Sequence, residues 1–226
     1  SRRRHTRYPL VTGVQTCALP IFGSLLKVVG RVLPMALQPL DIEATFRNWE
    51  GTHVIRGQKE VAAGKGRLED LRLIPNDPSP TSEGLAAISR ADWITLGPGS
   101  WFSSVLPHLL MPEQREAINQ SAAKKLIVLN LDATSTKSGD EFAGSSPSEH
   151  LTIMRKYSPE LRCDIALADQ SIAASPNERE SLETIVSEMG GRLVIEDLAT
   201  HPGSNHHDPD KLVSVFHHII ATEVIR

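Results

Sequence analysis

The strongest candidate for chemistry is the run Leu96-Gly97-Pro98-Gly99-Ser100, which ends an apolar stretch and precedes further hydroxyl residues. Glycine lets a backbone approach a ligand closely, and the start of a helix offers free N–H groups and the positive end of the helix dipole. The pattern predicts a phosphate cradle at the carboxyl end of a strand, where open α/β sheets bind ligands. An ordinary tight turn with serine as the helix N-cap explains the same residues. The run is neither a P-loop nor a dinucleotide GxGxxG motif.

A second candidate lies at the end of the apolar run 126–131, where Asn130 precedes a polar loop containing Asp132, Asp140 and Glu141. An amide at this place could read a base or a sugar, and the loop carboxylates could hold Mg²⁺ through a few ligands and water. A solvated loop with an asparagine turn is the competing interpretation. His150, on the helix after the loop, could face the same crevice, although a single histidine is more often structural.

Four residues near the C-terminal end invite a zinc interpretation: His201, His206, His207 and Asp208. Their spacing matches no zinc signature, so no metal site is predicted and Asp208 is expected to cap the final helix. No catalytic residue is predicted, because the glycine-rich run lacks the GxSxG nucleophile elbow. Cys163 directly precedes an apolar strand, which predicts a small buried hydrophobic residue.

Two kinds of element must position these residues. Residues 31–74 indicate an antiparallel β layer, because short runs alternate polar and apolar side chains and end at the prolines of 75–80. From residue 82 apolar strands alternate with helical segments, which predicts a parallel sheet with helices on both faces. The expected fold is α/β, a Rossmann-like three-layer sandwich with a mostly parallel sheet and a small antiparallel portion. The expected strands are 31–37, 41–46, 53–58, 67–74, 93–96, 126–131, 164–168 and 192–196, and the expected helices are 82–90, 103–110, 113–123, 147–157, 176–189 and 209–220.

Composition limits the class of protein. The 226 residues carry 24 basic and 27 acidic side chains, a formal net charge of −3, and 40% of them are hydrophobic. That share is enough for a core, yet no run approaches the ~18–20 apolar residues of a membrane-spanning helix. The acidic balance argues against a nucleic-acid binder held by phosphate neutralisation. Two cysteines exclude a disulfide scaffold and suit a reducing compartment.

The first 21 residues differ from the rest, because they carry four arginines and no acidic residue. A flexible basic arm is the simplest interpretation, and a targeting peptide fits poorly without a continuous apolar segment. Residues 1–7 and 11–21 resemble the in-frame translation of a sequencing-library adapter, so 1–21 are expected to be non-native. Residues 22–226 are then expected to form the C-terminal part of a single nucleotide-binding domain, with a β-rich portion at 31–74, an α/β portion at 82–226 and a missing N-terminal part.

Five stretches resemble the gluconeogenesis-factor family (YvcK-like), within the superfamily of the 2-phospho-L-lactate transferases (CofD-like). They are GRVLPMALQPLDIEA (30–44), ADWITLGPGSWFSSVLPHLL (91–110), LIVLNL (126–131), EHL (149–151) and HDPDKL (207–212). The GPGS block with its leading strand is specific, and the GRVLP block adds to it. Trp93, Trp101 and the pair Pro107-His108 are most similar to the actinobacterial branch.

The resemblance implies a Rossmann-like nucleotide-binding fold, a cytoplasmic location and binding of a uridine-diphosphate sugar such as UDP-N-acetylglucosamine. The family's members regulate envelope synthesis and cell shape during growth on gluconeogenic carbon sources. The implied ligand contacts are Gly97, Gly99, Ser100, Ser103, Ser104 and Asn130, with no catalytic residue and no required cofactor. No membrane or nucleic acid is expected as a partner, and the resemblance is compatible with a homodimer.

The alternative is a transferase of phospholactyl or phosphoryl groups that uses a nucleotide diphosphate donor and Mg²⁺, so enzymatic activity stays an open question. Two departures from the family pattern bear on the site. The family's N-terminal glycine-rich loop and Asp-Asp-Gly-Gly segment are absent, so half of the nucleotide site is expected to be missing. After Asn130, Asp140-Glu141-Phe142 stands where the family has Gly-Glu-Thr, with Glu141 alone retained.

Overall fold

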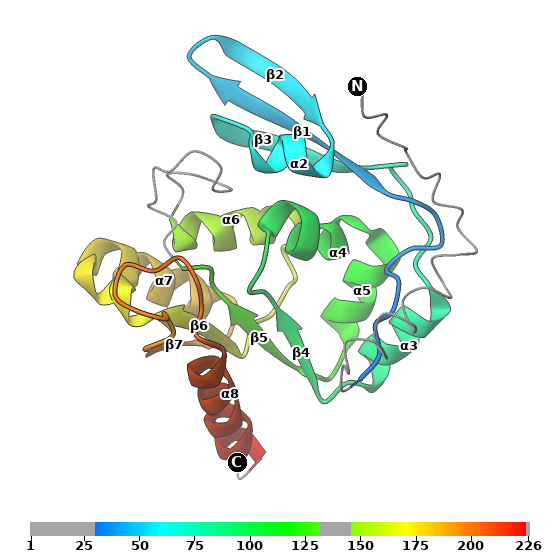
Figure 1. Ribbon diagram of the computed structural model, residues 1–226. Coiled ribbons are helices and arrows are strands. Elements are labelled where there is room, and N and C mark those ends of the chain that lie inside the picture. Colours follow the sequence, from blue (N-terminus) through cyan, green and yellow to red (C-terminus); the bar gives the residue numbers. More distant parts are fainter. Residues whose placement is uncertain (1–29, 132–145, 225–226) are drawn as a thin grey trace, which may run out of the picture.

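The computed structural model describes residues 30–131 and 146–224, and in this part of the chain two β-sheets are separated by a layer of helices (Figure 1). The remaining residues lie outside the described part of the chain. They include the segment 1–21, expected to be non-native, and the loop with Asp140 and Glu141, for which a Mg²⁺ role was considered.

The smaller sheet is antiparallel and contains β1 (Asp41–Asn48), β2 (Gly51–Arg56) and β3 (Arg67–Ile74) in the order β2-β1-β3. Alternate residues of β1, namely Ile42, Ala44 and Phe46, are buried, so one face of the sheet packs inward. The turn from β1 to β2 carries Trp49, whose surface is 92% exposed. The predicted antiparallel portion is confirmed, and a short helix that the sequence did not predict, α2 (Gln58–Ala62), follows β2.

The prediction of a strand at residues 31–37 is wrong. This segment is irregular, and only Ala36 pairs, in an isolated bridge with Pro80. Proline has no N–H to donate, and Pro34 lies within the segment itself, so a ladder cannot extend from this bridge. The apolar residues Met35 and Ala36 instead pack, partly buried, against the main core.

The larger sheet is wholly parallel among the described strands. It contains β4 (Trp93–Leu96), β5 (Lys124–Val128), β6 (Ile165–Asp169) and β7 (Arg192–Glu196) in that order. Every residue of β6 is buried, as expected for a central strand covered on both faces. The predicted parallel sheet is confirmed, and its strands bring residues 97, 130, 169 and 197 to one edge of the sheet.

Helices cover both faces of the parallel sheet, which confirms the three-layer α/β architecture (Figure 1). On one face the core includes residues of α4 (Leu106–Leu110), α5 (Pro112–Gln120), α6 (Pro147–Tyr157) and α7 (Pro176–Glu188). On the other face α8 (Pro209–Val224) packs on Leu126, Val128, Ile165 and Leu167 through Ile219 and its neighbours. Helix α3 (Ser82–Arg90) precedes β4, and the side chain of Thr81 caps its N-terminus by accepting from the backbone N–H of Gly84.

Two short helical turns depart from the predicted pattern. The helix expected at 103–110 begins as a π-helical turn, η1 (Trp101–Val105), and continues as α4. A 3-10 turn, η2 (Gln170–Ala174), follows β6 directly. Both turns lie where a strand ends, so both border the edge of the sheet at which open α/β folds bind ligands.

The two sheets share one hydrophobic core. Phe46 of β1 meets Phe102 of η1 edge-to-face, with 6.1 Å between the ring centroids. At the C-terminal end of α6 the Nζ of Lys156 donates a hydrogen bond to the backbone carbonyl of Glu69 in β3. The antiparallel sheet is therefore packed onto the helices that follow the glycine-rich turn. Among the described helices none is long and apolar enough to cross a membrane.

We expect Leu167→Ala to lower the free energy of unfolding by about 2–5 kcal/mol, because the truncation leaves a cavity in the centre of the sheet. Leu167 is fully buried in β6. The matched control is Leu37→Ala at a leucine that is 63% exposed. Urea denaturation of both variants checks this, and equal losses at the two positions would contradict the burial of β6.

Candidate functional site

The turn after β4 brings the chain against the neighbouring strand so closely that it requires glycine. Gly97 has a φ of 82°, a conformation that other residues rarely adopt. A Cβ atom at Gly97 would lie 2.4 Å from the carbonyl oxygen of Val128 in β5. The prediction that glycine allows a close backbone approach is thus met here by the protein's own adjacent strand.

Asn130 holds this turn in place with both ends of its side-chain amide. The backbone N–H of Gly99 donates to Oδ1 of Asn130 at 3.1 Å, and Nδ2 of Asn130 donates to the carbonyl oxygen of Gly99 at 2.9 Å. The amide that was predicted to contact a ligand is therefore engaged with the turn itself. The N–H of Gly99 is engaged as well, so a ligand contact at Gly99 would use its Cα surface.

The serines of the motif lie at the start of the helical run. The backbone N–H groups of Ser104 and Val105 donate to the carbonyl oxygen of Ser100 at 2.8 and 3.2 Å. A Cβ atom at Gly99 would lie 3.5 Å from Cβ of Ser104, which places those two positions side by side. The backbone of Ser103 belongs to η1, while its side chain is outside the described part. Gly97, Gly99, Ser100, Ser104 and Asn130 are therefore close together around one turn.

Two buried aromatic residues directly follow the turn and anchor it in the hydrophobic core. Trp101 and Phe102 are 2% and 1% exposed. Phe102 packs on the antiparallel sheet, and the ring of Trp101 lies 5.0 Å from the ring of His150 on α6. Burial lowers the pKa of His150 to about 4, so His150 is a neutral residue of the core at physiological pH. The expectation that His150 could face the crevice is wrong in this respect, because its side chain is only 2% exposed.

A cavity of about 540 Å³ opens beside Asn130, over the carboxyl ends of β5, β6 and β7. Its size falls within the range of small-molecule sites, and its place is the one that the topology predicts for a ligand. The lining includes Leu129, Asn130 and Leu131 after β5, residues 168–172 at the end of β6 and in η2, and Asp197, Ala199, Pro202, Gly203 and Ser204 after β7.

Asp169 fixes the wall between β6 and β7 and was not predicted from the sequence. Its carboxylate accepts hydrogen bonds from the backbone N–H groups of Ser171 at 2.8 Å, Leu198 at 2.9 Å and Ala199 at 3.1 Å. Burial by itself would raise the pKa of this carboxyl, but these donors outweigh it and hold the pKa below its usual range. The only sequence signal was an aspartate directly after a buried apolar run.

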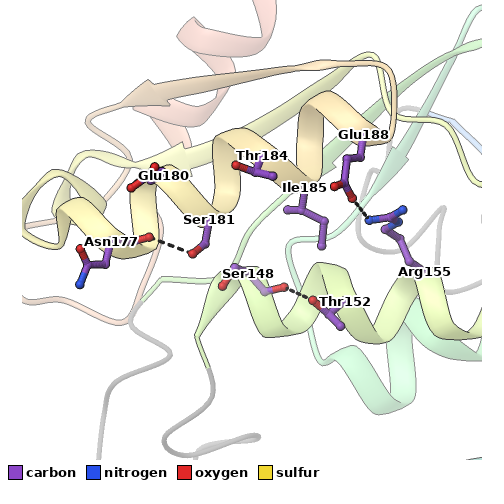
Figure 2. Close-up of a pocket in the computed structure, with 9 residues that line it drawn as sticks. All are labelled: Ser148, Thr152, Arg155, Asn177, Glu180, Ser181, Thr184, Ile185 and Glu188. Atoms are coloured by element: carbon purple, nitrogen blue, oxygen red, sulfur yellow. Dashed lines mark hydrogen bonds and ion pairs between the residues drawn. The ribbon is translucent and has the colours of Figure 1, made fainter.

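A second hollow, of about 660 Å³, lies between α6 and α7 (Figure 2). Its walls are polar, with hydroxyl residues along both helices and the ion pair of Arg155 and Glu188 at one end. The hydroxyls of Thr152 and Ser181 donate to carbonyl oxygens of their own helices. The cavity at the strand ends is the better candidate for a site, because it lies where the topology of an open parallel sheet predicts one.

The histidine-rich segment after β7 behaves as a structural loop. Asp208 accepts hydrogen bonds from the backbone N–H groups of Asp210 and Lys211, which confirms it as the cap of α8. Within the described ranges no group of three or more His, Cys, Asp or Glu side chains could hold a metal ion. Cys163 is 1% exposed and burial raises its pKa to about 12, which confirms a buried, protonated thiol.

Comparison with known proteins assigns a family to this arrangement. The sequence model described as 2-phospho-L-lactate transferase CofD matches residues 11–196. The chain belongs to the CofD family. Its relatives include the putative gluconeogenesis factor of Mycobacterium tuberculosis (strain H37Rv), which is 36% identical over 211 residues covering 92% of this chain and 60% of the relative. The gluconeogenesis factor of Halalkalibacterium halodurans is 32% identical over 159 residues, covering 70% of this chain and 46% of the relative.

Solved structures support the same fold for this CofD-family chain. A member of the upf0052 family from Bacillus halodurans aligns with a TM-score of 0.70 and 25% identity, covering 90% of this chain and 67% of that structure. The mycobacterial relatives agree with the actinobacterial resemblance of the sequence. The chain spans about 60% of the length of the Mycobacterium tuberculosis relative.

We expect Asn130→Asp to loosen the turn, because a carboxylate oxygen would replace the amide group that donates to the Gly99 carbonyl 2.9 Å away. The free energy of unfolding should fall by about 1–3 kcal/mol, and the amide hydrogen of Gly99 should exchange faster. Asn177→Asp, at an exposed position of α7, is the matched control. Unchanged exchange at Gly99 in the Asn130 variant would contradict this role.

We expect His150 to make the fold less stable in mild acid. Because its pKa is lowered from 6.5 to about 4 in the folded state, the unfolded chain binds the proton more readily. Stability from neutral His150 is complete above about pH 6.5 and is lost, on the order of 3 kcal/mol, as the pH falls toward 4. In urea titrations across this range His150→Phe should lose less stability than the parent, whereas a change at the exposed His217, His217→Phe, should match the parent.

Proposed function

We propose that this chain forms part of a binding site for a nucleoside-diphosphate sugar, with UDP-N-acetylglucosamine as the leading ligand, and that it acts as a regulator. The observation that carries the proposal is the turn Gly97–Ser100, pinned by Asn130 and opening beside a 540 Å³ cavity at the carboxyl ends of the parallel strands. Membership of the CofD family and relatives named gluconeogenesis factor support it.

The diphosphate would lie against the start of the helical run that opens at Trp101. Main-chain N–H groups and the helix dipole at such a start favour negative charge. The turn is rigid before any ligand arrives, because Asn130 bonds it in two directions. A rigid turn lowers the ordering cost of binding. Gly97, Ser100, Ser103 and Ser104 would provide the remaining contacts.

We favour a regulatory role over turnover because of the chemistry of the described residues. The groups that approach the turn are backbone amides, hydroxyls and a carboxamide, and His150 is buried in the core. The proposed biological role is control of envelope synthesis and cell shape in the cytoplasm during growth on gluconeogenic carbon sources. A phosphoryl or phospholactyl transferase with Mg²⁺ is the second candidate, because the matching family is described as 2-phospho-L-lactate transferase.

Isothermal titration with UDP-N-acetylglucosamine, with and without Mg²⁺, tests the proposal when product formation is followed in the same samples. The chain should be compared with a chimera in which it is joined to those segments of the Mycobacterium tuberculosis relative that have no counterpart in this chain. Saturable binding with the ligand recovered intact supports the regulator. Formation of a transfer product replaces it with the transferase, and no binding by either protein rejects the site.

We expect Gly99→Val to abolish this binding while the protein stays folded. The Cβ position at Gly99 lies 3.5 Å from Ser104, an ordinary contact, so the valine methyl groups would instead cover the surface offered to the diphosphate. Gly51→Val is the matched control, since Gly51 also has a positive φ, of 126°, with nothing within 4 Å of its Cβ position. Full binding by the Gly99 variant would exclude this turn as the phosphate site.

A further inference from the structure

The cavity beside Asn130 has a chemical character unlike that of the glycine-rich turn. The described residues that line it include three carboxylates, Asp169, Glu178 and Asp197, and no lysine, arginine or histidine. A phosphate placed among these carboxylates would be repelled, the more so in a concave, partly desolvated site. The part of a ligand that enters this cavity is therefore its uncharged part.

The carboxylates are fixed acceptors rather than a cation site. Glu178 accepts from the backbone N–H of Ser148 at 2.6 Å and from its hydroxyl at 2.9 Å. Asp169 is held by three backbone N–H groups, and Asp197 pairs with Lys211 at 2.8 Å. No group of three acidic or histidine side chains in the described ranges converges on a point where a metal could bind. Each carboxylate nevertheless keeps lone pairs that can accept from ligand hydroxyls.

The remaining lining suits a sugar better than a nucleobase. No phenylalanine, tyrosine or tryptophan is among the described lining residues, so the cavity offers no ring on which a base could stack. Aliphatic residues, prolines and serines line it instead, and these can face the C–H surfaces and the hydroxyl edges of a sugar ring. The apolar members are Leu129, Leu131, Pro147, Ala168, Ile172, Ala199 and Pro202, and the serines are Ser146, Ser171, Ser175 and Ser204.

We propose that the cavity over β5, β6 and β7 receives the uncharged, hydroxyl-bearing sugar of a nucleotide sugar, while its diphosphate stays at the Gly97–Ser104 turn. This assignment rests on the proposed function and sets the direction of the ligand along the sheet edge. Asn130 marks the boundary, because it both fixes Gly99 and lines the cavity. The site selects for neutral sugars and against sugars that carry an acid.

A cavity-filling variant tests the direction of the ligand. Ser175 lines the cavity, is exposed and makes no side-chain cap hydrogen bond at the start of α7. In whichever protein binds in the titration above, Ser175→Phe should weaken the binding of UDP-N-acetylglucosamine by about tenfold or more. The affinity for UDP should stay unchanged. Ser187→Phe, at an exposed serine near the other end of α7 and outside the cavity, should change neither affinity.

A pair of ligands tests the charge. UDP-glucuronic acid and UDP-glucose differ by one carboxylate on the sugar, so the acid should bind about tenfold more weakly. Asp197→Asn should reduce the difference in affinity between UDP-glucose and UDP-glucuronic acid. Asp210→Asn, at the exposed start of α8, should leave that difference unchanged.

The outcomes separate the two proposals. Binding of UDP and UDP-N-acetylglucosamine with equal affinity, insensitive to Ser175→Phe, overturns the sugar cavity while the nucleotide site stands. Equal or tighter binding of UDP-glucuronic acid overturns the selection against acids. Absence of binding by UDP and by both sugars rejects the proposed function itself, and the cavity assignment with it.

Discussion

The paired hydrogen bonds between the Asn130 amide and the Gly99 peptide are the constraint on which the site depends. They join the ends of two adjacent parallel strands, β4 and β5, at a point where the chain leaves the sheet. The pairing requires that the turn approach β5 closely, and Gly97 permits this because any Cβ would meet the Val128 carbonyl. One side chain and one missing side chain thus determine the path of the chain into the helices that follow.

At the neighbouring strands a side chain at the strand end also hydrogen-bonds the main chain of a connection, but the side chain is a carboxylate instead of an amide. At the end of β6 the carboxylate of Asp169 receives three backbone N–H groups, two of them from the chain after β7. Side chains at consecutive strand ends therefore satisfy the main chain of the next connection, where a partly buried N–H without a partner would be costly. The loops that border the cavity are therefore held in shape by hydrogen bonds within the protein. A ligand would find the walls already formed, at the price of little further ordering.

Much of this could be predicted from the sequence, because the signals were local. The alternation of β1, the apolar run of β6 and the Asp208 cap depend on neighbouring residues and agree with the structure. The strand expected at 31–37 failed because a strand needs a partner with N–H groups to offer, and here the partner was Pro80. The bond from Asn130 to Gly99 joins residues 31 positions apart, so it could not be read from either segment alone. Asp169 and the cavity were missed for the same reason, since both arise only when strands β5, β6 and β7 are placed side by side.

The three tryptophans lie in three different surroundings, and this gives the protein an internal optical reporter. Trp49 is 92% exposed at the hairpin tip, Trp93 is partly buried beside Lys124, and Trp101 is buried under the glycine-rich turn. An aqueous quencher would reach the emission of Trp49 first and that of Trp101 last. With Trp49 replaced by phenylalanine, the remaining fluorescence would come from Trp93 at the start of β4 and from Trp101 beside the candidate site. Events at the turn would then be visible without any added dye.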